Sequence, residues 1–164
     1  MNEGLSLPPL VSEIGEGKVT WQSLEDIDYK TLGYFLSCHL VIEHYLDEYL
    51  KIEYPGLDWD SARQTFSQKV SLLSKFKVSD KYDCIPAIKH LNSLRNKLSH
   101  NINFSMSSED LLPLIHYLKR GYGNEREITN EPKEILSQFT TMTCVLFAGR
   151  ISGRANTLIM NPNN

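Results

Sequence analysis

The ten-residue stretch Leu91-Asn92-Ser93-Leu94-Arg95-Asn96-Lys97-Leu98-Ser99-His100 decides the fold that we predict for this chain. Its three leucines recur at spacings of three and four residues, which places them on one buried stripe of a helix. Arg95, Asn96 and His100 lie off that stripe. They can therefore reach a groove or the surface of a partner.

Helical periodicity also marks the sequence on both sides of this stretch. The longest predicted helix begins after a capping aspartate, Asp28, and ends before Tyr54-Pro55-Gly56, because the residue before a proline disfavours the helical conformation. Four further helices follow the same pattern of apolar residues. The predicted helices cover residues 29–51, 60–75, from within 79–83 to 99, from about 107 to 120, and 132–151. This indicates an all-α fold, a single-domain bundle of four to five helices without a convincing strand pair.

The two ends of the chain lack such a pattern. Residues 1–28 mix glycine and proline with scattered acids, which indicates a loosely ordered arm, with a short helical turn near Trp21–Leu24. Residues 157–164 are expected to form a frayed tail. The helical domain is therefore predicted to span residues 29–156.

Composition restricts the class of protein. A chain of 164 residues suits one domain that buries a single core. No apolar run approaches the roughly 18 residues that cross a bilayer, and the first residues do not resemble a secretory signal. Cys38, Cys84 and Cys144 are isolated within apolar helical sequence, where small buried thiols are expected. These features favour a cytoplasmic protein without a membrane partner.

The charge is distributed unevenly. Residues 1–60 carry three basic residues against twelve acidic ones, whereas residues 61–100 carry eight basic residues against two acidic ones. The second segment contains the Arg95 stretch, and its positive charge would attract a phosphate backbone or an acidic partner surface. Alternatively, the acidic first helix packs beside the basic third helix.

The sequence offers no framework for a metal site or a cofactor. His39 and His44 are five residues apart, about 140° around a helix, and neither His-Glu-x-x-His nor Cys-x-x-Cys occurs. We therefore expect these histidines in the core or at an interface, and we predict neither a metal nor a cofactor.

A helical domain whose third major helix ends in Arg-Asn-x-x-x-His resembles the HEPN superfamily. The motif stands here as Arg95-Asn96-Lys97-Leu98-Ser99-His100, and the likeness extends over residues 29–120. The Asn103-Phe104-Ser105 segment resembles the branch related to the mannitol-operon repressor. The chain departs from the toxin pattern at Ile102, where that pattern places a tyrosine.

The resemblance implies a metal-independent endoribonuclease, acting as a toxin or defence effector, whose site forms across a homodimer. Such chemistry needs a proton acceptor, a proton donor and a cation for the phosphorane charge, and histidine and arginine supply these functions. One chain supplies a single pair, about 140° apart on a regular helix, which converges best if the helix unwinds near His100. The expected catalytic residues are Arg95, His100 and Asn96, with Lys89, Lys97 and Ser99 contacting RNA.

Three other interpretations remain open. Arg95 and His100 could simply cap the helix C-terminus, where cations are favoured. The chain could be a non-catalytic regulator of the mannitol-operon type that binds a protein or a nucleic acid. It could also be a dimeric scaffold. A toxin would be accompanied by an antitoxin, and a regulator by a regulatory partner.

Overall fold

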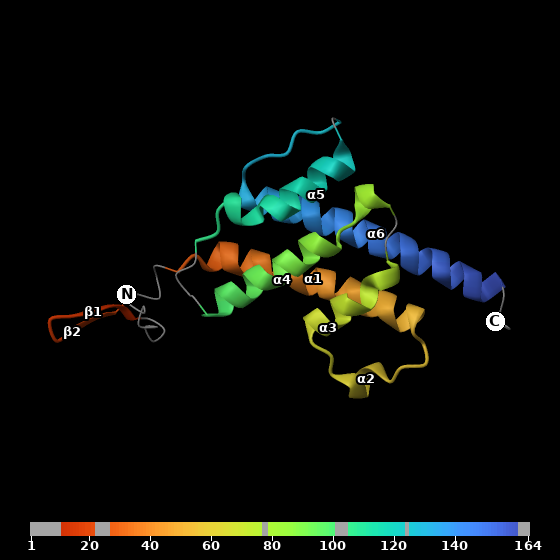
Figure 1. Ribbon diagram of the computed structural model, residues 1–164, viewed down its shortest axis with the longest axis horizontal. Helices are drawn as coiled ribbons and strands as arrows, with labels where there is room; N and C mark the ends of the chain where they lie inside the picture. The colour runs from red at the N-terminus through yellow and green to blue at the C-terminus, as the bar shows by residue number, and fades with distance from the viewer. Residues whose placement is uncertain (1–10, 22–26, 77–78, 101–104, 124, 161–164) are drawn as a thin grey trace.

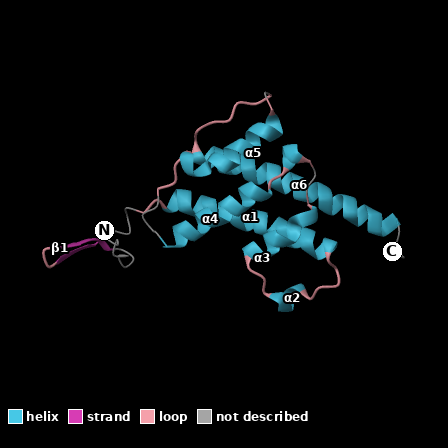
Figure 2. Cartoon of the chain, in the orientation of Figure 1, coloured by secondary structure: helices cyan, strands magenta, loops and turns pink. Residues whose placement is uncertain are grey.

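Helices account for most of the molecule, which confirms the all-α prediction (Figure 2). The computed structural model describes residues 11–21, 27–76, 79–100, 105–123 and 125–160. Within these ranges the side chains of Ser12, Ser74, Lys75, His100 and residues 157–160 are not described. The described residues form six α-helices, short 3₁₀ turns and one β-hairpin.

Helix α1, Tyr29–Glu53, follows the predicted pattern closely. The Asp28 side chain accepts a hydrogen bond from the Thr31 amide at 3.1 Å, which satisfies one unpaired donor of the first turn. The helix ends at Tyr54, whose amide donates to the Leu50 carbonyl at 2.9 Å. Capping residues readable in the sequence therefore set both ends of the longest predicted helix.

The predicted second helix, residues 60–75, is broken into three parts. Helix α2 spans Trp59–Ala62, helix α3 spans Phe66–Ser71, and the 3₁₀ turn η2 covers Leu72–Lys75. Arg63 interrupts the helix because it adopts a left-handed conformation with a φ of 39°. Thr65 and Gln68 then cap α3 reciprocally, at 2.8 and 3.3 Å. The prediction of one continuous helix was wrong at this point.

The motif helix is α4, Ile85–His100, which follows the 3₁₀ turn η3, Asp80–Tyr82. The Asp83 carboxylate accepts from the Ile85 amide at 3.1 Å, so that it caps the helix as expected. Pro86 stands in the first turn, where its missing amide has no helical partner to lose. Helix α4 remains α-helical through His100.

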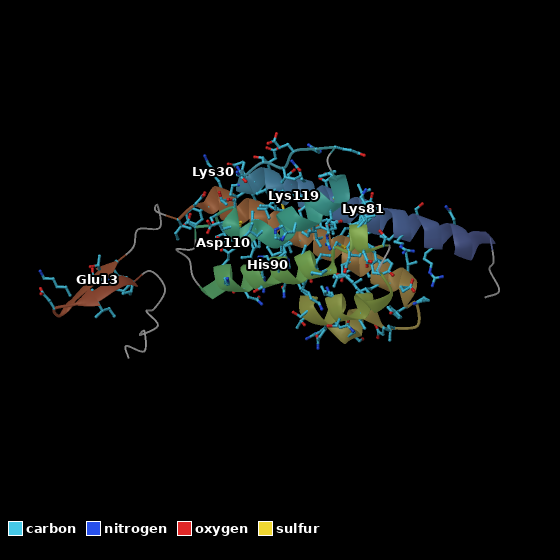
Figure 3. All side chains as sticks on the ribbon, turned by 45° about the horizontal axis from the view of Figure 1, so that its top comes forward. Glu13, Lys30, Lys81, His90, Asp110 and Lys119 are labelled. Atoms are coloured by element: carbon cyan, nitrogen blue, oxygen red, sulfur yellow. The ribbon has the colours of Figure 1, made fainter. Side chains whose placement is uncertain are left out.

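Helix α5, Leu112–Tyr122, follows the 3₁₀ turn η4, Glu109–Leu111. As the capping sequence predicts, the Ser107 amide donates to the Asp110 carboxylate at 3.0 Å. His90 Nε2 lies 2.6 Å from the Asp110 carbonyl oxygen and ties this segment to α4. Both residues are labelled in Figure 3.

Helix α6, Pro132–Met160, is longer than predicted. The prediction that this helix ends at Ile151 is wrong. The prediction of a frayed tail from residue 157 is also wrong for residues 157–160, which are helical, and residues 161–164 lie outside the described part of the chain. Arg154 explains the extension, because its guanidinium bonds both oxygens of Glu53 on α1, at 3.1 and 3.3 Å. The two long helices run side by side (Figure 1).

The core fills the space among α1, α4, α5 and α6. An aromatic cluster joins three segments: the ring centroid of Phe76 lies 5.0 Å from Tyr49 and 4.4 Å from Phe147. Cys38 and Cys84 are buried and Cys144 is half-buried, as expected of small thiols in apolar sequence. The buried leucines of α4, Leu91, Leu94 and Leu98, belong to the same core as the buried face of α1, and this packing positions the motif.

A β-hairpin stands apart from the bundle in Figure 1 and contradicts the prediction of no strand pair. Strands β1, Val11–Gly15, and β2, Lys18–Trp21, pair antiparallel. Glu16 and Gly17 form the two-residue turn with φ of 49° and 73°, the left-handed geometry that suits a tight hairpin. Trp21 therefore belongs to a strand, and the rest of the predicted helical turn, residues 22–24, lies outside the described residues.

Each described helix is too short or too polar to cross a membrane.

Candidate functional site

The exposed face of α4 carries the predicted site residues. Lys89, Asn96 and His100 stand at spacings of seven and four, so that they occupy one side of the helix. Lys97 is also exposed and stands about 100° around the helix from Asn96. The face is therefore polar and basic along the whole second half of α4.

Arg95 and Asn96 are neighbours in space as well as in sequence. The Arg95 Nη1 atom donates to Asn96 Oδ1 at 3.5 Å, a long hydrogen bond between two exposed side chains. The Ser99 hydroxyl donates to the Asn96 carbonyl at 2.8 Å. Local contacts thus hold Asn96 and Ser99, while the remaining donors of the Arg95 guanidinium have no partner among the described residues.

The Arg95–His100 pair does not converge through the backbone. Because α4 stays helical to His100, the expected unwinding is absent up to that residue, and the two positions remain about 140° apart. The side chain of His100 lies outside the described residues, as does the Asn101–Phe104 segment that carries part of the family resemblance.

The carboxylates of α1 form their ion pairs with helices other than α4 among the described residues. Lys69 on α3 bonds Glu43 and Asp47, each at 2.9 Å. Burial alone would lower the pKa of Lys69, but these two bonds outweigh it and raise the pKa. The sequence alternative paired the acidic first helix with the third predicted helix, which is α4, but the partner of Glu43 and Asp47 is Lys69 on α3, within the predicted second helix.

The cations of α4 form no comparable pairs. No ion pair among the described residues involves Lys89, Arg95 or Lys97. All three side chains are exposed. Their charge is available to an anionic partner.

Arg95 borders a groove of about 480 Å³ between α1, the start of α3, and α4. This volume lies within the range of about 300–1,000 Å³ that small-molecule sites occupy. The lining combines aliphatic, aromatic and polar side chains: Leu36, His39, Leu40, Glu43, Gln64, Thr65, Phe66, Asn92 and Arg95.

His39 lies at the base of this groove and is 4% exposed. Its ring packs on Phe66 with 4.3 Å between the ring centroids, and its Nδ1 atom faces the Glu43 carboxylate at 3.9 Å. Burial lowers the pKa of His39, and the positive charge of Arg95 acts in the same direction, against the opposing effects of Asn92 and Glu43. The imidazole is therefore neutral at pH 7.

Two polar atoms of the groove have no partner among the described residues. They are His39 Nε2 and Gln64 Oε1, both shielded from water. The Asn92 amide nitrogen, in contrast, donates to the Ser67 hydroxyl at 3.0 Å, and Asn92 also lines the groove. Buried polar atoms without partners are uncommon and call for an explanation.

The lowered pKa of His39 predicts a pH-dependent stability. Unfolding returns the imidazole to water and to a pKa near 6.5, so the unfolded chain binds a proton more readily than the folded chain. The free energy of unfolding should therefore fall as the pH drops below about 6.5. Urea denaturation at pH 7.5 and at pH 5.5 measures this change.

The variant His39→Gln isolates the contribution of this histidine. The variant retains the carboxylates of the protein, including Glu43, and should lose less stability than the wild type between the two pH values. An identical loss in both proteins would assign the pH dependence to other groups.

Sequence reasoning found the α4 residues but missed the groove. His39 was expected in the core or at an interface, and its burial confirms that expectation, while His44 is exposed. Glu43 stands four residues after His39 on α1, a spacing that predicts adjacency on one helical face. Gln64 and Asn92 carry no such signal, because they stand on separate segments of the chain that only the fold brings to α1.

Comparisons with protein-family models, with curated proteins and with solved structures gave no match.

Proposed function

We propose that the protein is a HEPN-type endoribonuclease that cleaves single-stranded RNA without a metal ion, through a composite site across a homodimer. The observation that carries the proposal is the exposed Arg95, which has no acidic partner among the described residues and lies on the basic face of α4 beside a groove. A guanidinium in this setting grips phosphate oxygens through two parallel hydrogen bonds.

The reaction needs two proton-transfer groups as well as a cation. One group removes the proton from the 2′-hydroxyl, whose oxygen attacks the phosphorus, and a second group protonates the leaving 5′-oxygen. His100 from each of two chains supplies these groups, and Arg95 stabilises the charge on the phosphorane. Asn96 orients the reacting groups, while Lys89, Lys97 and Ser99 hold the flanking RNA.

An exposed apolar strip on α1 supports the dimer. Leu36 and Leu40 stand one turn apart and are 37% and 63% exposed, and both border the groove that contains Arg95. A two-fold contact through this strip buries the same residues of both chains and brings the two Arg95 side chains toward a common cleft.

The experiment is an RNA cleavage assay with the purified protein in EDTA. We expect cleavage of single-stranded RNA to products with 2′,3′-cyclic phosphate and 5′-hydroxyl ends. Products with 3′-hydroxyl ends, or the absence of cleavage, would contradict the proposal. Absence of cleavage together with salt-dependent binding of a nucleic acid or a protein would favour the non-catalytic regulator.

Leu40→Asp tests the dimer. The substitution places one unpaired carboxylate on each side of the proposed interface, and a buried charge without a partner is strongly destabilising. We expect the dimer to dissociate about 100-fold more readily and cleavage to fall with the dimer population. Sedimentation equilibrium and the RNA assay at matched concentrations measure both effects.

Leu57→Asp is the matched control, because Leu57 is 48% exposed in the loop between α1 and α2. It should leave association and cleavage unchanged. A wild-type protein that stays monomeric while it cleaves RNA would rule out the composite site.

A further inference from the structure

We propose that the groove between α1, the start of α3, and α4 binds a nucleobase that carries an exocyclic amino group, with the adjoining phosphate on Arg95. The inference rests on the proposed function, because it assigns to that function a subsite that reads the base next to the cleaved bond. It adds a recognition element that the motif residues of α4 do not supply.

The walls of the groove suit a flat ring. Leu36 lines the groove from α1 and Phe66 lines it from the start of α3, with its ring tilted 37° against that of His39, while Leu40 stands at the side of the proposed dimer contact. Any planar base gains affinity in such surroundings from stacking and from the burial of apolar surface, whichever base it is. The walls therefore explain why a base enters the groove, but they do not select one.

The two polar atoms of the groove without a partner among the described residues can both accept a hydrogen bond, and these two atoms select the base. The His39 Nδ1 atom faces the Glu43 carboxylate, which favours the tautomer with its proton on Nδ1 and leaves Nε2 as an acceptor. Gln64 Oε1 lacks a partner, and the Asn92 amide nitrogen is already engaged with Ser67. Glu43 adds a carboxylate to the same lining.

An edge rich in acceptors is complemented by an amino group. Adenine, cytosine and guanine each present one, whereas the corresponding edge of uracil carries a single N–H between two carbonyl oxygens. Uracil would bring its carbonyl oxygens against the acceptors of the groove. His39 Nε2 and Gln64 Oε1 belong to residues that line the groove, and both atoms are shielded from water.

Arg95 fixes the position of the phosphate. It lies at the border of the groove, and its guanidinium retains donors that the long bond to Asn96 does not use. A base in the groove therefore places its own phosphate on the residue that the proposed reaction requires. This arrangement predicts that base binding and phosphate binding depend on different side chains.

The test is a calorimetric titration of the wild-type protein with AMP, CMP, GMP and UMP at low salt. We expect at least one of the three amino-bearing nucleotides to bind about tenfold more tightly than UMP, the difference typical of one good base contact. Equal affinities for all four nucleotides, or tightest binding of UMP, would overturn the inference.

Variants assign the selectivity to the groove. Gln64→Leu and Asn92→Leu remove acceptors at similar volume and should abolish the preference over UMP, whereas the loop substitution Asn130→Leu should retain it. Arg95→Gln should weaken all four nucleotides equally. Selectivity that survives in both leucine variants would place the base elsewhere and overturn the assignment.

The titration and the RNA assay separate this inference from the proposed function. Selective binding of nucleotides by a protein that does not cleave RNA would refute the proposed nuclease alone. Cleavage by a protein that binds the four nucleotides equally would refute the base groove alone.

Discussion

Replacing Arg95 or His100 with alanine is expected to lower RNA cleavage by about 100-fold or more. Loss of one preorganised donor at a developing charge commonly costs a factor of about 10²–10³, and loss of a proton-transfer group costs about 10²–10⁴. Arg95 is exposed on α4, and the long bond to Asn96 is the only hydrogen bond of its side chain among the described residues. Single-turnover cleavage of a labelled RNA measures the loss.

The folded state should hardly change in the Arg95 variant, since no buried contact is removed. Its midpoint of thermal unfolding should match that of the wild type. Arg95→Lys should recover only part of the activity, because lysine retains the charge but lacks the planar pair of donors. Arg150→Ala removes an exposed arginine from α6 and serves as the control. Equal cleavage by wild type, Arg95→Ala and His100→Ala would refute the catalytic assignment.

The helices that the sequence predicts best are those whose ends have local chemical causes. Asp28 and Asp83 cap α1 and α4, and the Ser107 segment precedes α5, as expected from the residue types alone. The predictions fail where distant contacts decide. The left-handed Arg63 and the bond between Arg154 and Glu53, residues 101 positions apart, change the second and the last helix.

The candidate site divides in the same way. Spacing within α4 places Lys89, Asn96 and His100 on one face, because a helical period relates them directly. The groove joins residues from three separate elements, and no single period relates His39 to Gln64 or to Arg95. Binding of a ligand in that groove can therefore be inferred from the structure but not from the sequence.

Phe147→Ala is expected to cost about 3–5 kcal/mol of unfolding free energy, the usual range for a fully buried phenylalanine. Phe147 is 0% exposed, and its ring centroid lies 4.4 Å from Phe76 and 5.7 Å from Tyr49. The truncation opens a cavity where α6 meets α1 and the segment after η2. Urea denaturation at pH 7.5, compared at equal protein concentration, measures the change.

Two further variants show whether the loss comes from this packing. Val145→Ala, two residues earlier on α6 at a position 64% exposed, should change the stability by no more than about 0.5 kcal/mol. Phe147→Leu retains most of the buried volume and should recover more than half of the loss. A loss below about 1 kcal/mol for Phe147→Ala would contradict the packing of α6 on α1. Since α1 carries the groove and the apolar strip, a loose α6 would also weaken the case for both sites.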